Sequence, residues 1–426
     1  MQVIISPSSL NGSVTAPASK SVMQRACAAA LLKGGRTVLK NPGKSADDEA
    51  ALNIIQQLGA IVESSDDKII INSKGIKPVS NTIDCGESGL SVRMFTPIAA
   101  LSYAPINITG SGSLMKRPLS FFDEVLPNLG IVIKSNSGLL PLQIQGPLNP
   151  KSITIDGSLS SQFLTGLLFA FSAANANDVT ITVANLNSKP YIDLSLEVMK
   201  SFGLSIPVNN DYKSFYYSAD LNTSDKLAPH SFFVEGDWSG AAFLLVAGAI
   251  AGEIKVKGLN ASSVQADKTI LKALEDAGTQ IEYFENEISV SPVNLMAFNF
   301  DATDSPDLFP PLVALASYCK GKSVIKGVNR LTHKESNRSF SLQEEFKKLG
   351  VNIAIENDDM IIKGGSGIKA ATVNSHHDHR IAMACGVAAL KAVGNVTIEG
   401  AEAVNKSYPL FWQHLKSLGA VLSLKD

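Results

Sequence analysis

The 426-residue sequence has few cysteines and no long apolar segment. Its four cysteines are widely separated and form no Cys-x-x-Cys pair, which argues against a disulfide framework and is typical of a reducing cytosol. The longest apolar run, Ala241 to Gly252, is well short of the ~20 residues that a membrane-spanning helix needs. The N-terminus lacks the basic and apolar stretches of an export signal. We therefore expect a cytoplasmic protein with no membrane partner.

An excess of charge of either sign is also missing. Lys plus Arg number 37 and Asp plus Glu 39, so the formal net charge is −2, which argues against bulk affinity for nucleic acid or an anionic membrane. Charged residues make up 18% of the chain and hydrophobic residues 45%, a composition that predicts buried globular cores and not disorder. At about 100–200 residues per domain, the length predicts roughly two or three domains.

Motifs for common cofactors are incomplete. The two Gly-Lys-Ser tripeptides, at 43–45 and 321–323, lack the upstream glycine of a P-loop, and Gly110-Ser111-Gly112 is only the start of a dinucleotide fingerprint. Three histidines, His376, His377 and His379, could bind zinc, but no acidic or cysteine residue stands at a matching spacing. An anion-binding loop and plain solvated histidines are the alternatives. We expect no metal and no ATP or NAD cofactor.

An internal repeat organises the chain. An amphipathic helix that ends at a glycine and continues into an alternating strand recurs at intervals of roughly 70 residues. Glycine suits the left-handed backbone conformation that ends a helix, so we predict this conformation at each of the glycines. They are Gly59, Gly130, Gly203, Gly278, Gly350 and Gly419.

Each repeat also contains a helix that is almost wholly apolar. Such a helix is buried on every side, and strands precede and follow it, so each repeat predicts the order βαβαββ in an α/β fold. The predicted buried helices are Val22 to Leu32, Val92 to Leu101, Phe163 to Ala174, Ala241 to Ala251, Leu308 to Tyr318 and Ile381 to Leu390.

The sixth repeat is incomplete at the C-terminus. The strands Gln2 to Ser6 and Ser13 to Ala16 at the other end of the chain can complete it. This closure predicts two similar domains of three repeats each, residues 1–18 with 235–426 and residues 19–234. A single long solenoid is the alternative, but six repeats without a capping repeat fit two closed domains better.

Polar clusters stand at the start of every buried helix. Helix N-termini carry free N–H groups and partial positive charge, so several that converge form an anion site. If the domains direct these ends toward one cleft, the ligand there carries several negative charges, and phosphates and carboxylates fit best. Cations that follow the neighbouring strands add to this site: Lys116, Arg117, Lys189, Lys334, Arg338 and Lys406.

Short polar stretches at the helix starts and in the neighbouring loops follow one another in a characteristic order. They are Ser19–Arg25, Arg117–Leu119, Asp156–Phe163, Ser188–Asp193, Val234–Asp237, Pro306–Asp307, Lys334–Arg338, Asp378–Arg380 and Lys406–Pro409. On these stretches the chain resembles, from end to end, the 5-enolpyruvylshikimate-3-phosphate (EPSP) synthases of the enolpyruvyl transferase family. The family's fold, two domains of three βαβαββ repeats in an inside-out α/β barrel with the active site in the interdomain cleft, agrees with the repeat.

The resemblance implies transfer of the enolpyruvyl group of phosphoenolpyruvate to the 5-hydroxyl of shikimate 3-phosphate in the shikimate pathway, by a monomer without metal or cofactor. Asp307 is implied as the base and Glu335 as the acid, with Lys20 also placed for proton transfer. The implied shikimate 3-phosphate contacts are Lys20, Ser21, Arg25, Ser160, Ser161, Gln162, Ser188, Tyr191, Asp307 and Lys334. The implied phosphoenolpyruvate contacts are Lys20, Gly89, Arg117, Gln162, Arg338, Arg380 and Lys406.

Three rival functions remain at this stage. A transferase that uses UDP-N-acetylglucosamine as acceptor shares this fold, but its mobile loop carries a reactive cysteine, and the loop Gly110 to Pro118 has none. A silent phosphometabolite-binding relative would be expected to lose Asp307 or Glu335, and an RNA-end cyclase would need a nucleotide site. Departures from the family pattern affect substrate affinity and inhibitor response more than reaction type. They are Glu87, Leu90, Arg330 and Asn337.

Overall fold

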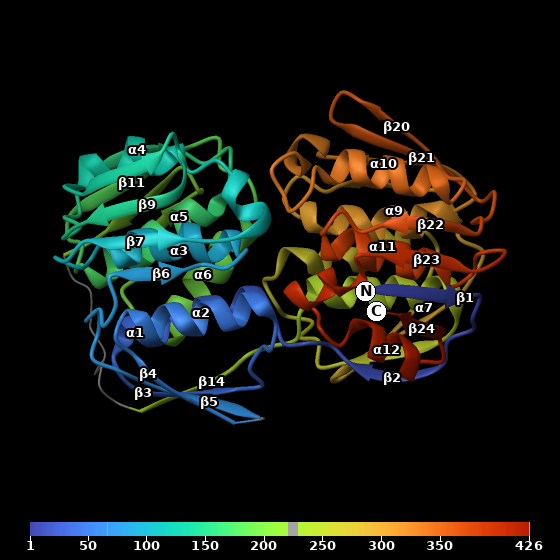
Figure 1. Ribbon diagram of the computed structural model, residues 1–426, viewed down its shortest axis with the longest axis horizontal. Helices are drawn as coiled ribbons and strands as arrows, with labels where there is room; N and C mark the ends of the chain where they lie inside the picture. Colours follow the sequence, from blue (N-terminus) through green and yellow to red (C-terminus); the bar gives the residue numbers. More distant parts are fainter. Residues whose placement is uncertain (66, 220–228, 426) are drawn as a thin grey trace. The chain divides into compact units, whose positions relative to one another are not determined.

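The structure is a computed structural model that describes residues 1–65, 67–219 and 229–425. The chain divides into two compact units (Figure 1). Unit 1 comprises Met1–Ser19 and Glu235–Asp426, and unit 2 comprises Lys20–Val234. Ser19, which the sequence assigns to the second domain, belongs to unit 1, because its N–H donates to the Glu235 carbonyl (2.8 Å) and its hydroxyl to Gln265 Oε1 (3.0 Å).

The predicted buried helices are confirmed, three in each unit. Every residue of α7, for example, is buried. Within each unit the three buried helices contact one another, so each core is built around a helical centre. The buried helices are α1 (Lys20–Lys33), α3 (Gly89–Ala99) and α5 (Ser161–Ala173) in unit 2, and α7 (Trp238–Ala251), α9 (Phe309–Tyr318) and α11 (His379–Ala389) in unit 1.

A second helix in each repeat is amphipathic, and the glycine that follows it has a positive φ angle in all six repeats, as predicted. These helices are α2 (Ala46–Gln57), α4 (Ser120–Val125), α6 (Pro190–Ser201), α8 (Ile270–Asp276), α10 (Arg338–Lys348) and α12 (Phe411–Ser417). Short 3-10 helices are η1 (Gly112–Lys116), η2 (Leu126–Leu129), η3 (Ala266–Thr269), η4 (Pro306–Leu308), η5 (Val328–Leu331) and η6 (Ala401–Lys406).

Four-stranded sheets cover the helical centres (Figure 1). In the order given below for each sheet, the first and second strands are parallel, and each later strand is antiparallel to the strand before it. The orders in unit 2 are β14 (His230–Phe233), β3 (Gly35–Lys40), β5 (Lys68–Ser73), β4 (Ile61–Ser64); β6 (Thr82–Asp84), β7 (Ile106–Thr109), β9 (Leu139–Gln145), β8 (Val132–Asn136); and β10 (Ile153–Asp156), β11 (Val179–Ala184), β13 (Ser214–Tyr217), β12 (Val208–Asn210). Those in unit 1 are β2 (Gly12–Thr15), β15 (Ile254–Lys257), β17 (Glu287–Ser291), β16 (Gln280–Phe284); β18 (Asn299–Asp301), β19 (Gly321–Lys326), β21 (Asp359–Gly364), β20 (Asn352–Glu356); and β22 (Ala371–Asn374), β23 (Val396–Glu399), β1 (Gln2–Ser6), β24 (Val421–Lys425).

The placement of one N-terminal strand is corrected by these sheets. β1 completes the sixth repeat by pairing with β23 and β24, as the sequence predicts. β2, which the sequence assigns to the same repeat, pairs in parallel with β15 and belongs to the repeat of α7. The chain leaves unit 1 after Ser19, so β2, the strand ahead of α1, belongs to unit 1. In the same way β14, the strand ahead of α7, belongs to unit 2, where it pairs with β3.

In the described residues, no helix is both long and apolar enough to cross a membrane.

The closest helix packing in unit 2 depends on a glycine. A Cβ atom at Gly166 of α5 would lie 2.6 Å from the Arg93 carbonyl and 2.9 Å from the Met94 carbonyl of α3. Both are backbone atoms of a buried helix and cannot move independently. Gly166 therefore sets how near α3 and α5 approach one another.

We expect Gly166→Ala to lower the free energy of unfolding by about 1–3 kcal/mol, because overpacking against backbone outweighs the roughly 1 kcal/mol that alanine gains in helix propensity. Urea denaturation followed by circular dichroism measures the change. Gly248→Ala in α7 is the comparison, since its added Cβ would meet a side-chain atom, Ile254 Cγ1, at 2.7 Å and the nearest backbone atom, the Val290 carbonyl oxygen, only at 3.3 Å, so its loss of stability should be smaller. A Gly166→Ala variant as stable as wild type would contradict the prediction.

Candidate functional site

A carboxylate surrounded by cations forms the centre of a charged cluster in unit 1. Asp307, in η4 ahead of α9, accepts from Lys334 Nζ at 3.0 Å and Arg338 Nη1 at 2.7 Å through Oδ1. Its Oδ2 accepts from Arg380 Nη2 at 3.2 Å. Lys334 precedes α10, Arg338 begins it and Arg380 lies in the first turn of α11. The starts of three helices thus converge on one carboxylate.

The electrostatics of this cluster keep Asp307 ionised. Burial alone raises the pKa of Asp307, but the charges of Arg380, Lys334 and Arg338 outweigh burial and hold the pKa well below its usual value. Burial lowers the pKa of Lys334, and the nearby Asp307 charge opposes that shift. Asp307 is therefore a proton acceptor at neutral pH, and it is a weak one while all three cations surround it.

Arg338 is the anchor of the cluster, and only 1% of its side chain is exposed. Its Nε donates to Asp378 Oδ2 at 2.8 Å, and its Nη2 forms a short hydrogen bond to Glu335. Asp378 is itself the N-cap of α11 and accepts from the Arg380 N–H at 2.9 Å. One carboxylate therefore fixes both the start of α11 and the Arg338 guanidinium.

Glu335 lies between two cations. Besides its bond to Arg338, its Oε1 lies 3.8 Å from Lys406 Nζ at the end of η6. Both side chains are about nine-tenths buried. Glu335 is therefore held in place by a cation on each side.

Unit 2 gathers the other predicted residues around the starts of its own buried helices. Lys20, the first residue of α1, donates to Asp47 of α2 at 2.8 Å. Arg25, predicted to bind ligand, is 1% exposed and uses three of its five N–H donors within the protein. Its Nε donates to Ser195 Oγ at 2.9 Å, its Nη1 to the Ser21 carbonyl at 2.9 Å and its Nη2 to the Tyr191 carbonyl at 3.3 Å. Arg25 thus ties Ser21 and Tyr191 together.

The start of α3 brings two guanidinium groups close to a glycine. A Cβ atom at Gly89 would lie 2.5 Å from Arg117 Nη1 and 3.2 Å from Arg93 Nη1, so only glycine leaves these groups in place. Arg93 also donates to Gln162 Oε1 at 2.9 Å. The helix start, Arg117 and Gln162 therefore form one electropositive region.

The remaining predicted residues lie at a helix cap and in a loop. Ser160 is the N-cap of α5 and accepts from the Gln162 N–H at 3.3 Å, and Ser161 follows it. Ser188 has a φ angle of 57° and is buried just before α6, which contains Tyr191. These hydroxyls stand at helix starts, where phosphate is commonly bound.

The structure also shows residues that hold the predicted site residues in place and that the site prediction omits. Asp47 pairs with Lys20, Asp378 orients Arg338, and Arg93 joins Gln162 to the start of α3. Glu87 accepts from the backbone N–H and the hydroxyl of Ser113, and so fixes the segment that carries Arg117. Asp378 stands in the matching stretch Asp378–Arg380, at the start of an apolar helix, whereas Asp47 has no comparable signal in the sequence.

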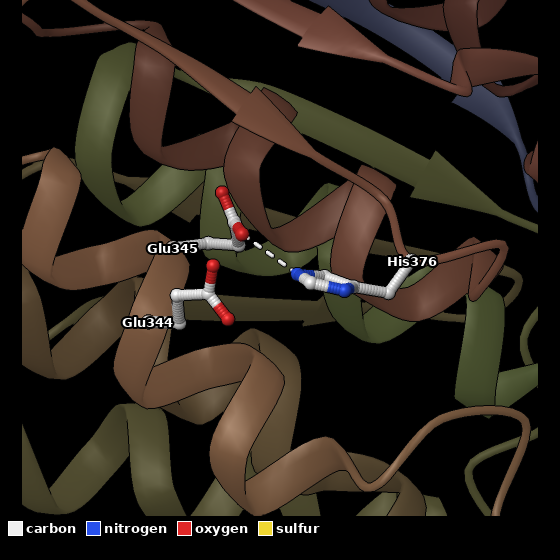
Figure 2. Close-up of side chains that lie close together, drawn as sticks. All are labelled: Glu344, Glu345 and His376. Atoms are coloured by element: carbon white, nitrogen blue, oxygen red, sulfur yellow. Dashed lines mark hydrogen bonds and ion pairs between the residues drawn. The ribbon is translucent and has the colours of Figure 1, made fainter.

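His376 does lie beside acidic residues, which sequence spacing does not reveal. Figure 2 shows Glu344 and Glu345 of α10 facing His376, with His376 Nε2 2.7 Å from Glu345 Oε1. These are metal-ligand types, but Lys348 Nζ already lies 2.8 and 2.9 Å from the two oxygens of Glu345. An internal cation therefore occupies the position beside this carboxylate, and we assign no metal to the group.

Comparison with known proteins defines first the fold and then the family. The chain is similar to the EPSP synthase structure from Acinetobacter baumannii (TM-score 0.82, 24% identity, 99% of this chain and 100% of that one). It is also similar to the enolpyruvyl transferase NikO from Streptomyces tendae (TM-score 0.77, 16% identity, 99% and 98%). The fold is therefore the two-domain α/β fold of the enolpyruvyl transferases.

The family follows from sequence. The family model EPSP synthase (3-phosphoshikimate 1-carboxyvinyltransferase) matches residues 4–415. The 3-phosphoshikimate 1-carboxyvinyltransferases of Clostridium perfringens and Clostridium acetobutylicum are 38% and 37% identical over 424 and 422 residues. The first match covers 99% of each chain, and the second 98% of this chain and 97% of the relative. The chain belongs to the EPSP synthase family.

We expect Asp307→Asn to lower the free energy of unfolding by about 1–3 kcal/mol at neutral pH, because three cations lose their shared counter-charge. The folded pKa of Asp307 lies below its unfolded value of about 3.9, so the carboxylate stabilises fully above that value and less as the pH falls toward the folded pKa. The stability difference between wild type and variant should be constant from about pH 5 to 8 and shrink below about pH 4. Urea denaturation across this range measures it, and a difference independent of pH would be the opposing result.

Proposed function

We propose that the protein transfers the enolpyruvyl group of phosphoenolpyruvate to the 5-hydroxyl of shikimate 3-phosphate and releases inorganic phosphate. The observation that carries this proposal is the Asp307 cluster, in a chain that matches the EPSP synthase family over nearly its whole length. It combines an ionised proton acceptor with three cations, and the two substrates together carry two phosphates and two carboxylates.

The chemistry begins with an addition. The oxygen of the 5-hydroxyl group attacks C2 of phosphoenolpyruvate while Asp307 takes the proton of that hydroxyl group. Glu335 gives a proton to the methylene carbon of phosphoenolpyruvate. The product is a tetrahedral ketal phosphate. Glu335, which is now a carboxylate, then takes a proton from the new methyl group as the carbon–oxygen bond to phosphate breaks, and this restores the double bond and releases inorganic phosphate. Phosphoenolpyruvate supplies its own leaving group.

The cations have two tasks in this scheme. They stabilise the negative charge that develops on the transferred group, and they regulate the basicity of Asp307. Anionic substrates compete with Asp307 for Lys334, Arg338 and Arg380, so substrate binding weakens the interactions that keep its pKa low. Asp307 thus becomes a stronger base when both substrates are bound.

The proposed substrate contacts follow the family pattern. Hydroxyls and Asp307 contact the acceptor together with three cations, and most of the contacts to the donor are guanidinium and ammonium groups. Lys20 is a third candidate for proton transfer. Contacts to shikimate 3-phosphate are Lys20, Ser21, Arg25, Ser160, Ser161, Gln162, Ser188, Tyr191, Asp307 and Lys334. Contacts to phosphoenolpyruvate are Lys20, Gly89, Arg117, Gln162, Arg338, Arg380 and Lys406.

The rival transferase that uses UDP-N-acetylglucosamine is not favoured. The family model and the Clostridium relatives carry the EPSP synthase name, and the loop Gly110 to Pro118 has no cysteine. Phosphate release from phosphoenolpyruvate tests the choice directly. Shikimate 3-phosphate should support turnover and UDP-N-acetylglucosamine should not; the reverse preference, or no release with either acceptor, would refute the proposal.

We expect Asp307→Asn and Glu335→Gln each to reduce kcat by about 10²-fold or more, the usual scale for a positioned acid or base. KM for both substrates should stay within an order of magnitude, because the cations that bind the anions remain. Steady-state phosphate release measures both constants. Activity near wild type in either variant would remove that residue from its proposed role.

A further inference from the structure

A buried glutamate joins α10 to the loop that precedes α11. The side chain of Glu345 is fully buried and accepts from Lys348 Nζ, from the backbone N–H of Asn374 at 2.9 Å and from His376 Nε2 at 2.7 Å. A carboxylate can only accept, so the proton of His376 lies on Nε2. Figure 2 shows Glu345 directed from α10 toward His376.

The loop that Glu345 contacts has an unusual backbone. His376 and His377 have φ angles of 51° and 55°, in the left-handed region that residues with a side chain seldom adopt, here twice in succession. Hydrogen bonds fix the turn internally: the His376 N–H donates to Asn374 Oδ1 at 2.7 Å and the His377 N–H to Ser375 Oγ at 3.2 Å. Such a conformation persists only where its surroundings hold it.

The far end of the loop carries two residues of the Asp307 cluster. Asp378 bonds Arg338, and Arg380 bonds both the carboxylate and the carbonyl oxygen of Asp307. Arg338 and Glu345 are seven residues apart on α10, which is two turns, or about 10 Å, along the same face of the helix. α10 therefore contacts both ends of the segment 374–380, through Glu345 at the start and Arg338 near the end.

We infer that Glu345 is a positioning residue for the reaction. Glu345 holds the segment 374–380 so that Asp378 contacts Arg338 and Arg380 contacts Asp307. Lys348 supplies the counter-charge that makes a buried carboxylate acceptable at this place. This inference rests on the proposed function, because it assigns to Glu345 an effect on phosphoenolpyruvate through Arg338 and Arg380. Glu345 itself contacts neither reacting group.

The test compares Glu345→Gln with Glu344→Gln in the full-length protein. Glutamine has the same size, but an NH2 group replaces one of the two carboxylate oxygens, so the groups that donate to that oxygen lose their acceptor. We expect Glu345→Gln to raise KM for phosphoenolpyruvate about tenfold, with KM for shikimate 3-phosphate within about twofold of wild type. Glu344, whose side chain is 58% exposed and lies 3.5 Å from Lys348, is the matched control and should change neither constant.

A double-mutant cycle separates positioning from a merely structural role. In an Arg380→Lys background, Glu345→Gln should cause less than about a threefold further change in KM for phosphoenolpyruvate, because the group it positions is already impaired. Fully additive effects, or a fall in kcat with both KM values unchanged, would overturn the inference. If Glu345→Gln does not fold, His376→Ala removes one partner of Glu345 and should raise KM for phosphoenolpyruvate in the same direction, by about two- to fivefold; an unchanged KM would again overturn it.

Hydrogen exchange keeps this inference distinguishable from the proposed function. The amides of residues 374–380 should exchange at least tenfold faster in Glu345→Gln than in wild type or Glu344→Gln, whatever reaction the protein catalyses. Unchanged exchange would show that Glu345 does not hold the segment. An inactive wild type with accelerated exchange in Glu345→Gln would refute the proposed function. It would show that Glu345 holds the segment 374–380 but that this contact does not serve the proposed reaction.

Discussion

A helix that is apolar around its whole circumference is stable in water only when other elements cover it on every side. Each unit of this protein meets that constraint by packing three such helices together and surrounding them with sheets. Only the helix ends then remain near solvent, so polar groups concentrate there. In unit 1 Asp307, just ahead of the buried α9, and Arg380, at the start of the buried α11, meet for this reason, and the amphipathic α10 adds Arg338. In unit 2 the starts of α1, α3 and α5 approach one another through Gln24, Ser88, Arg93 and Gln162.

Gathering cations in so small a volume is unfavourable unless carboxylates are interspersed. Asp307, Glu335 and Asp378 provide the opposite charges around Arg338 in unit 1, and Asp47 does so for Lys20 in unit 2. The carboxylates differ in accessibility, since Asp378 is fully buried whereas a quarter of the Asp307 side chain is exposed. Buried Asp378 suits a permanent structural tie, and accessible Asp307 suits a group that exchanges its partners for a substrate.

Helix α10 contacts the segment 374–380 at two points. α10 begins with Arg338 in the charged cluster and carries Glu345 two turns later, beside the loop that leads to α11. A helix is a stiff element, so both contacts hold the segment 374–380 in one register. A positively charged group such as Arg380 can then be placed accurately although it follows two residues with an unfavourable backbone conformation.

The repeat, the fold class and most of the residues in the Asp307 cluster and at the helix starts of unit 2 can be predicted from the sequence. Apolar helices, helix-ending glycines and polar caps are local signals, and they carry their meaning without any knowledge of distant contacts. Local signals do not report which strands pair, so the placement of β2 in the repeat of α7 came only from the structure. They also do not report neighbours that are remote in sequence, such as Asp47 beside Lys20 or Glu345 beside His376. Nor do they show that Arg25 uses three of its N–H donors within unit 2. Strand pairing and the partners of buried charges both depend on how elements that are remote in sequence pack together. Local signals do not contain that information, and a buried charge is tolerated only where packing brings it a partner.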